Sequence, residues 1–89
     1  MRAVITVVGK DSVGILAKVS DVCAKCNVNI TEVSQSVLED MFCMIMMADI
    51  SKSSVEFTTF SQELGEYGKN SNLSIHVMHE DIFNSMHRI

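Results

Sequence analysis

Four segments of the chain carry the hydrophobic pattern of β-strands. Residues 3–8 and 41–50 are nearly continuous runs of apolar and β-branched residues, as in strands that are buried on both faces. Residues 29–38 and 73–78 mix apolar with polar residues, which favours strands with one exposed face. We therefore predict four strands, with the first and third in the centre of a sheet. Glu39 and Asp40 are the expected hairpin tip between the second and third strands.

A first helix is predicted between the first two strands, where apolar residues recur at helical spacing. The members of this apolar stripe are Ile15, Val19, Val22 and Cys26, with Leu16 and Cys23 widening it. Asp11 or Ser12 is available as the N-cap of this helix, because short polar side chains accept hydrogen bonds from the first-turn amides. Asn27 suits the end of the helix, because asparagine tolerates the left-handed backbone found there.

Two more helices are predicted in the second half of the chain. Residues 53–56, with the sequence Ser-Ser-Val-Glu, match a capping box that would open a second helix, and Gly68 would end it. The apolar stripe of this helix is Phe57, Phe60, Leu64 and Tyr67. A short C-terminal helix is indicated by the stripe Ile82, Phe83, Met86 and Ile89.

The predicted order is β-α-β-β-α-β followed by a tail helix, which is the order of the ferredoxin-like fold. Right-handed crossovers would place both main helices on one face of a four-stranded antiparallel sheet with strand order 4-1-3-2. We therefore expect an α+β sandwich in a single domain, residues 1–89. Its βαββαβ core would span residues 1–79 and its C-terminal helix residues 80–89. The tail helix, a partner subunit or both would cover part of the second sheet face.

Composition narrows the class of protein. The chain has 89 residues, of which 47% are hydrophobic and 20% charged, a balance that indicates a globular domain rather than a disordered one. The net charge is −4 and the seven Lys and Arg residues are scattered, which disfavours nucleic-acid binding. The N-terminal apolar run is too short for a membrane span and lacks a cleavage-site pattern. Three cysteines in such a chain favour reduced thiols and a cytoplasmic location.

Metal and redox chemistry find little support in the pattern. Cys23 and Cys26 form a Cys-x-x-Cys pair, but they fall in the last helical turn and on the apolar stripe, so we predict core thiols. His76 and His79 could complete a zinc set with them, yet two residues three apart on a regular strand face opposite sides. We therefore expect no bound metal.

Catalysis and phosphate binding are disfavoured on similar grounds. Ser12, Ser20 and Ser36 have no recognisable base partner in a Ser-His-Asp pattern. Gly9 and Gly14 have the spacing of a phosphate loop, but Ile15 and Leu16 stand where Lys and Ser or Thr are required. We therefore expect neither an enzyme nor a cofactor.

The segment from residue 7 to residue 20 resembles the ACT domain, a regulatory module that binds small molecules. Residues 11–17 match the family's Asp-x-x-Gly-Ile-Leu-Ala signature, and residues 29–30 match its Asn-Ile pair after the helix. The resemblance covers the whole chain and is to the small stand-alone ACT-domain proteins of bacteria and archaea. Val13 departs from the family, which often has proline there, and Asn27 stands where glycine is common.

The resemblance implies an amino-acid ligand beside the first strand–helix loop, usually at a dimer interface. The implied ligand-binding residues are Asp11, Ser12, Val13, Gly14, Ile15, Leu16, Asn29 and Ile30. A helix N-terminus suits a carboxylate, and Gly14 lets a ligand approach the backbone closely. Asp11 can attract an ammonium group, and the Asn29 amide can both donate and accept hydrogen bonds.

A structural interpretation of the same residues stays open at this point. Asp11 would simply cap the helix, Gly14 would allow close packing and Asn29 would hydrogen-bond its own turn. The sequence therefore leaves two functions. We expect a homodimeric regulatory protein that senses an amino acid or a similar small metabolite. The alternative is a ligand-free interaction module that docks on an enzyme or a transcription regulator.

Overall fold

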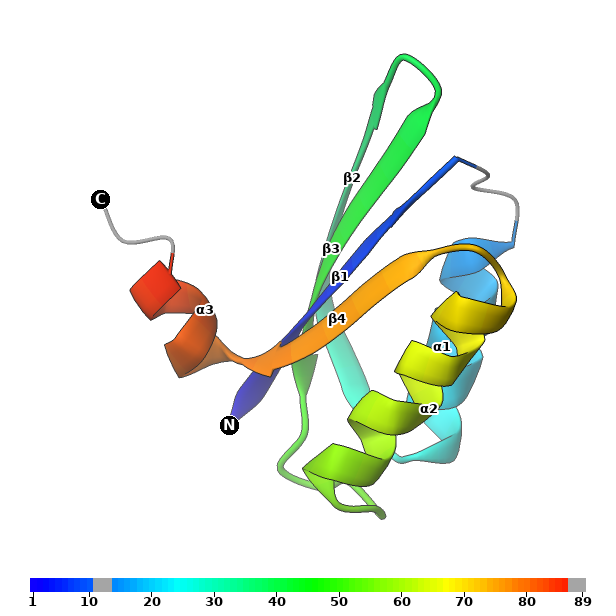
Figure 1. Cartoon of the computed structure of the whole chain (residues 1–89). Coiled ribbons are helices and arrows are strands. Elements are labelled where there is room, and N and C mark those ends of the chain that lie inside the picture. Colours follow the sequence, from blue (N-terminus) through cyan, green and yellow to red (C-terminus); the bar gives the residue numbers. More distant parts are fainter. Residues whose placement is uncertain (11–13, 87–89) are drawn as a thin grey trace.

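The computed structural model describes residues 1–10 and 14–86, and in these residues four strands form one sheet. The strands are β1 (Arg2–Gly9), β2 (Asn29–Leu38), β3 (Met41–Asp49) and β4 (Ser74–His79). They pair antiparallel in the order β2-β3-β1-β4. The helices are α1 (Ile15–Lys25), α2 (Phe57–Asn70) and α3 (Glu80–Met86). Figure 1 shows α1 and α2 on one face of the sheet and α3 on the other side. The predicted fold class and strand order are confirmed.

The hydrophobic core lies between the sheet and the two longer helices. Alternate residues of the central strands face it, and cross-strand pairing sets Ile5 beside Met46 and Val7 beside Met44. The helices contribute residues from the predicted stripes, all with at most 2% of their surface exposed: Ile15, Val19, Cys23, Phe60 and Leu64. The helical and strand periodicities of the sequence therefore identify the buried faces correctly.

The second sheet face is only partly covered. Val4 points to this face and is fully buried near the start of β1, where α3 contacts β1 and β4. Further along the same face, Met41 and Ile45 of β3 remain 37% and 43% exposed. The tail helix therefore supplies part of the predicted cover and leaves an apolar part of the face open.

The start of α1 differs from the prediction. The N-cap is Gly14, with φ 76° and ψ 0°, and no side chain of the described residues caps the helix there. The predicted N-cap, Asp11 or Ser12, is wrong because the chain enters the helix through this left-handed glycine. At the other end Asn27 has φ 58°, and the Val28 N–H donates to the Cys23 carbonyl at 2.8 Å. The predicted role of Asn27 at the helix end is confirmed.

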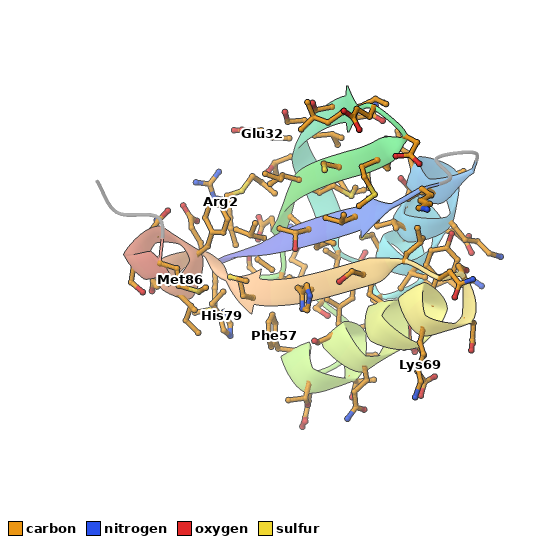
Figure 2. The ribbon with its side chains drawn as sticks, turned by 45° about the horizontal axis from the view of Figure 1, so that its top comes forward. Arg2, Glu32, Phe57, Lys69, His79 and Met86 are labelled. Atoms are coloured by element: carbon orange, nitrogen blue, oxygen red, sulfur yellow. The ribbon has the colours of Figure 1, made fainter. Side chains whose placement is uncertain are left out.

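Both predicted ends of α2 are also wrong. The helix begins at Phe57, and its N-cap Glu56 makes no side-chain capping bond, so residues 53–56 form no capping box. The Ser53 hydroxyl instead donates to the carbonyl of Val55 at 2.8 Å. Phe57 stacks its ring on the imidazole of His79 at the end of β4 (Figure 2).

Gly68 does not end α2, which continues to Asn70. A Cβ atom at Gly68 would lie 3.0 Å from the carbonyl oxygen of Leu73 and 2.9 Å from Cγ1 of Ile75. The glycine is therefore a packing site, where the last turns of the helix approach the chain that enters β4.

A two-pronged ion pair ties α3 to the start of β1. The Arg2 guanidinium donates from Nε and Nη2 to the two Glu80 carboxylate oxygens, at 2.8 and 2.6 Å. These hydrogen bonds and the charge of Arg2 hold the pKa of Glu80 below its ordinary value of 4.5. The ion pair therefore joins the first strand, β1, to the helix that follows the last strand, β4.

This ion pair predicts that acid loosens α3. A carboxyl with a lowered folded pKa stabilises the fold above its unfolded pKa, and the contribution is lost as pH falls through the folded pKa. We therefore expect the amide protection factors of α3 to fall between about pH 5 and pH 3, ahead of those of α2. Glu80→Gln should lower these protection factors at neutral pH and remove their acid dependence. Unchanged α3 protection down to the acid unfolding of the whole domain would contradict the role given to this pair.

Candidate functional site

The first part of the predicted site lies at the N-terminus of α1. The first helical bond runs from the Lys18 N–H to the Gly14 carbonyl at 3.0 Å, so the three preceding amides have no acceptor within the helix. A Cβ atom at Gly14 would meet no atom within 4 Å, which leaves the approach to these amides open among the described residues. Ile15 is buried and anchors the turn in the core, whereas Leu16 is 38% exposed beside it.

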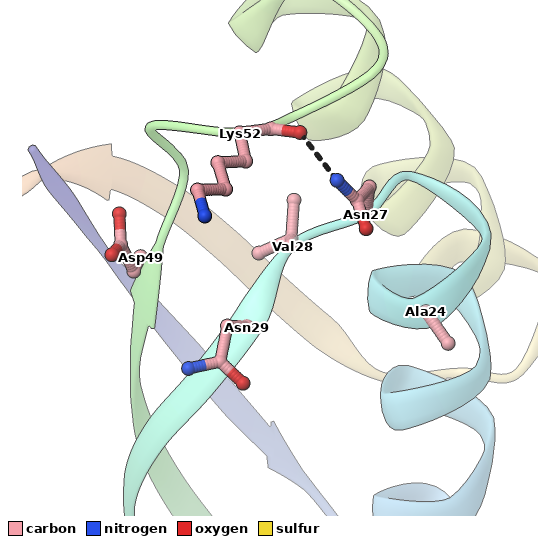
Figure 3. Close-up of a pocket in the computed structure, with 6 residues that line it drawn as sticks. All are labelled: Ala24, Asn27, Val28, Asn29, Asp49 and Lys52. Atoms are coloured by element: carbon pink, nitrogen blue, oxygen red, sulfur yellow. Dashed lines mark hydrogen bonds between the residues drawn. The ribbon is translucent and has the colours of Figure 1, made fainter.

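The second part lies in a surface hollow at the opposite end of α1 (Figure 3). The hollow has a volume of about 460 Å³ and is lined by Ala24, Asn27, Val28, Asn29, Asp49 and Lys52. Asn29 opens β2 and pairs directly with Asp49 at the end of β3. The Asn27 amide donates to the Lys52 carbonyl at 2.7 Å, which fixes the exit of α1 against the loop that follows β3. The hollow thus combines a carboxamide, a carboxylate and an ammonium group.

Asp49 is held as an anion at the edge of this hollow. The hydroxyl of Ser51 donates to its Oδ1 atom, and the Ser51 N–H donates to the same atom at 2.9 Å. These hydrogen bonds lower the pKa of Asp49, and the charge of Lys52 acts in the same direction. Asp49 therefore offers a fixed negative charge next to the Asn29 amide.

The structure places the two parts of the predicted site at opposite ends of α1. Gly14, Ile15 and Leu16 stand at its start, and Asn29 and Ile30 follow its end. The helix has 11 residues, so it separates the two parts by about 16 Å. One copy of the chain therefore does not bring these residues into one pocket.

Four other residues of the predicted site do not add to either part. One of them is structural, and the other three lie outside the described residues. Ile30 pairs with buried Ala48 and packs against the core, so its side chain is structural. Asp11, Ser12 and Val13 lie outside the described residues. The sequence interpretation missed Asp49 and Lys52. The sequence did contain a signal for Asp49. In the predicted hairpin, the first residues of the second strand lie beside the last residues of the third strand, so Asp49 is a neighbour of Asn29.

The cysteine pair belongs to the core, as predicted. Cys23 and Cys26 are 1% and 2% exposed. Burial, with a smaller contribution from Cys26, raises the pKa of Cys23 to about 11. Burial and the neighbouring Glu63 carboxylate, 3.5 Å from Sγ, also raise the pKa of Cys26. Both thiols therefore stay protonated at neutral pH, as expected for cysteines that pack in the core.

The histidines of β4 face opposite sides of the sheet, as predicted. His76 pairs with Thr6 on the open face, and His79 pairs with Ala3 on the face that carries α2. Across residues 1–10 and 14–86, no three side chains of the metal-binding types converge. In the same residues, no helix is both long and apolar enough to cross a membrane.

Comparisons with known proteins agree with the observed fold and with the family resemblance. The family model described as ACT domain matches residues 2–78. A UPF0237 protein of Listeria monocytogenes is 47% identical over 89 residues, which is 100% of both chains. A UPF0237 protein of Methanocaldococcus jannaschii is 44% identical over 88 residues, covering 99% of this chain and 98% of the relative. The ACT domain protein from Streptococcus pneumoniae superposes with a TM-score of 0.80 at 38% identity over 93% of each chain. The chain therefore belongs to the ACT domain family, whose members are typically regulatory and bind ligands.

Proposed function

We propose that this protein is a small, non-catalytic regulatory sensor that binds an amino acid or a similar small metabolite at the loop between β1 and α1. The observation that carries the proposal is Gly14, a left-handed glycine at the start of α1, where a Cβ atom would meet no described residue within 4 Å. The free amides of the first turn and the positive end of the helix dipole suit the carboxylate of such a ligand. The regulatory, ligand-binding character of the ACT family supports the same assignment.

A homodimer would unite the two parts of the site. A two-fold axis passing beside the middle of α1 would bring Gly14 of one copy to Asn29 of the other, and would form two equal sites. Strand β2 favours such an axis, because it is an edge strand of ten residues beside α1. Pairing of two β2 strands would set the two α1 helices side by side in opposite directions.

The composite site would match both charged ends of an amino acid. The first turn of α1 in one copy would receive the carboxylate. The hollow of the second copy would present the Asn29 amide and the Asp49 carboxylate, which is held ionised and suits an ammonium group. Asp11 is a second candidate for that ammonium group.

The test is a thermal-shift screen of the full chain against the twenty amino acids and related metabolites. A ligand at a hundred times its dissociation constant stabilises a folded protein by about 2.7 kcal/mol. For a domain of this size, that corresponds to a rise in Tm of roughly 10 °C or more. Gly14→Val should abolish the rise, because valine would fill the approach to the amides and is strained at φ 76°.

Two controls make this result interpretable. Asn29→Ala should weaken the binding of the same ligand without touching the loop. Met86→Ala, in the exposed part of α3 on the other side of the sheet, should leave the response unchanged. If Gly14→Val fails to fold, Asn29→Ala still tests the site. A flat screen on folded wild-type protein, or a ligand response that survives both site variants, would overturn the sensor proposal.

The alternative is a ligand-free interaction module, and one observation favours it. Met41 and Ile45 stay exposed on the sheet face that α3 leaves open, and such apolar surface suits a protein partner. The same thermal-shift screen distinguishes the two functions, because we expect no metabolite to stabilise a ligand-free interaction module.

A further inference from the structure

We propose that the ligand is an acidic amino acid, whose side-chain carboxylate binds the ammonium group of Lys52. The assignment rests on the sensor function proposed above and names the ligand class of the same composite site. It starts from the hollow beside the end of α1, where Lys52 and Asp49 present opposite charges to one space. Figure 3 shows the Lys52 side chain running from the loop after β3 toward the space bounded by Asp49 and Asn29.

Lys52 supplies the positive charge of this hollow that has no counter-charge bound to it. The ion pairs of the described residues join Arg2 to Glu80 and Lys25 to Asp21. Lys25, in the last turn of α1, is therefore already neutralised, with 3.2 Å between its Nζ atom and the Asp21 carboxylate. Within the same described residues, the ammonium group of Lys52 forms no ion pair. It is the group that an anionic part of a ligand would meet.

The loop that carries Lys52 is held at the hollow by its main chain. The Asn27 amide donates to the Lys52 carbonyl at 2.7 Å, and the Ser54 N–H donates to the Cys26 carbonyl at 2.8 Å. Both hydrogen bonds tie the loop to the end of α1, and from the loop they use main-chain atoms alone. Replacing the Lys52 side chain therefore leaves both bonds in place and tests the ammonium group by itself.

The Asp49 carboxylate, which would bind the ammonium group of the ligand, lies among positive charges. The charges of Lys52 and of the Met1 α-amino group both act on it, although neither forms an ion pair with it in the described residues. Arg2 lies opposite Asp49 on β1, but the Glu80 carboxylate occupies its guanidinium through two hydrogen bonds. A ligand ammonium at Asp49 therefore meets repulsion, chiefly from Lys52 across the hollow, unless the ligand also carries an anion there.

An acidic side chain removes this repulsion. In a neutral amino acid, the ammonium group at Asp49 would face the like charge of Lys52 with no anion between them. In an acidic amino acid, the side-chain carboxylate pairs with Lys52, while the α-carboxylate binds the first turn of α1 in the other copy. Positive and negative charges then alternate from Asp49 through the ligand to Lys52. The hollow thus disfavours neutral amino acids by repulsion and favours acidic ones by attraction.

The experiment compares each acidic amino acid with its amide by isothermal titration calorimetry of the full chain. Glutamate is compared with glutamine and aspartate with asparagine, because the members of each pair have nearly the same shape and differ by one charge. We expect the acid of at least one pair to bind about five- to tenfold more tightly, since a charge-assisted hydrogen bond is about twice as strong as a neutral one. Added salt should reduce this preference, because the hollow lies at the surface.

Three variants test the role given to Lys52. Lys52→Gln should abolish the preference for the acid, whereas Lys52→Arg keeps the charge and should keep the preference. Lys69→Gln is the matched control, because it removes the same charge from an exposed position on α2 (Figure 2). Helix α2 packs on β4, at the opposite edge of the sheet from β2, so this control should leave the preference intact.

The outcomes distinguish a wrong ligand class from a wrong function. The acidic ligand is contradicted if both amides bind as tightly as their acids, if the preference survives Lys52→Gln, or if this variant weakens acids and amides equally. If none of the four compounds binds while another metabolite gives a thermal shift that depends on Gly14, the ligand class is wrong and the sensor function stands. A flat response to every metabolite overturns both.

Discussion

Replacing Leu64 with alanine is expected to lower the free energy of unfolding by about 2–5 kcal/mol. The side chain is 0% exposed and lies in the core between α2 and the sheet. Its truncation removes buried apolar surface and leaves a cavity, because a close-packed core relaxes only in part. A domain of 89 residues has a free energy of unfolding of roughly 4–13 kcal/mol, so this one substitution would remove a large share of it.

The measurement is denaturation by urea, with the midpoint expected to fall while the slope stays the same. Leu38→Ala is the matched control, because it removes the same atoms from a side chain that is 68% exposed near the hairpin tip. We expect that control to change the free energy of unfolding by less than about 0.5 kcal/mol. Equal effects of the two substitutions would contradict the core assigned to α2.

The sequence was sufficient for the fold because burial follows simple periods. Ile15, Val19 and Cys23 recur at helical spacing and are all buried in the core. The continuous apolar run of residues 41–50 correctly predicted a central strand, which lies between β2 and β1. Hydrophobic periodicity is a property of each segment by itself, so it can be interpreted before the tertiary neighbours are known.

The helix ends were predicted less well, because the residue patterns that mark a helix end also occur in other structural roles. A serine followed three residues later by glutamate matches a capping box, but Ser53 bonds to Val55 in a turn before the helix begins. A glycine late in a helix is typical of a helix end, but at Gly68 it permits close packing against β4. Which use applies depends on neighbours that lie far away in the sequence.

The candidate site was also predicted only in part. The sequence indicated candidate ligand-binding residues at the loop before α1 and at the start of β2. The length of α1 already implied that Gly14 and Asn29 stand far apart in one chain. His79 continues the alternation of Ile75 and Val77, which assigns it to the inner face of β4.

Gly68→Val is expected to destabilise the protein by about 2–3 kcal/mol through overpacking. A Cβ atom there would come within 3.0 Å of the Leu73 carbonyl oxygen and 2.9 Å of Cγ1 of Ile75, and valine adds two methyl groups to that Cβ. Leu73 cannot withdraw freely, because its own N–H donates to the Gly68 carbonyl at 2.8 Å. Thermal unfolding should show a fall in Tm of roughly 4–8 °C for each kcal/mol.

Gly65→Val separates this packing effect from helix propensity. Gly65 lies in the same helix three residues earlier, and a Cβ atom there would meet nothing within 4 Å. Valine is slightly better than glycine in a helix interior, so we expect Gly65→Val to change the stability by less than about 0.5 kcal/mol. Because both substitutions carry the same propensity term, the difference between them measures the contact with β4. If the Gly68→Val protein were as stable as the Gly65→Val protein, Gly68 would have no special packing role. That result would contradict the close approach of α2 to β4.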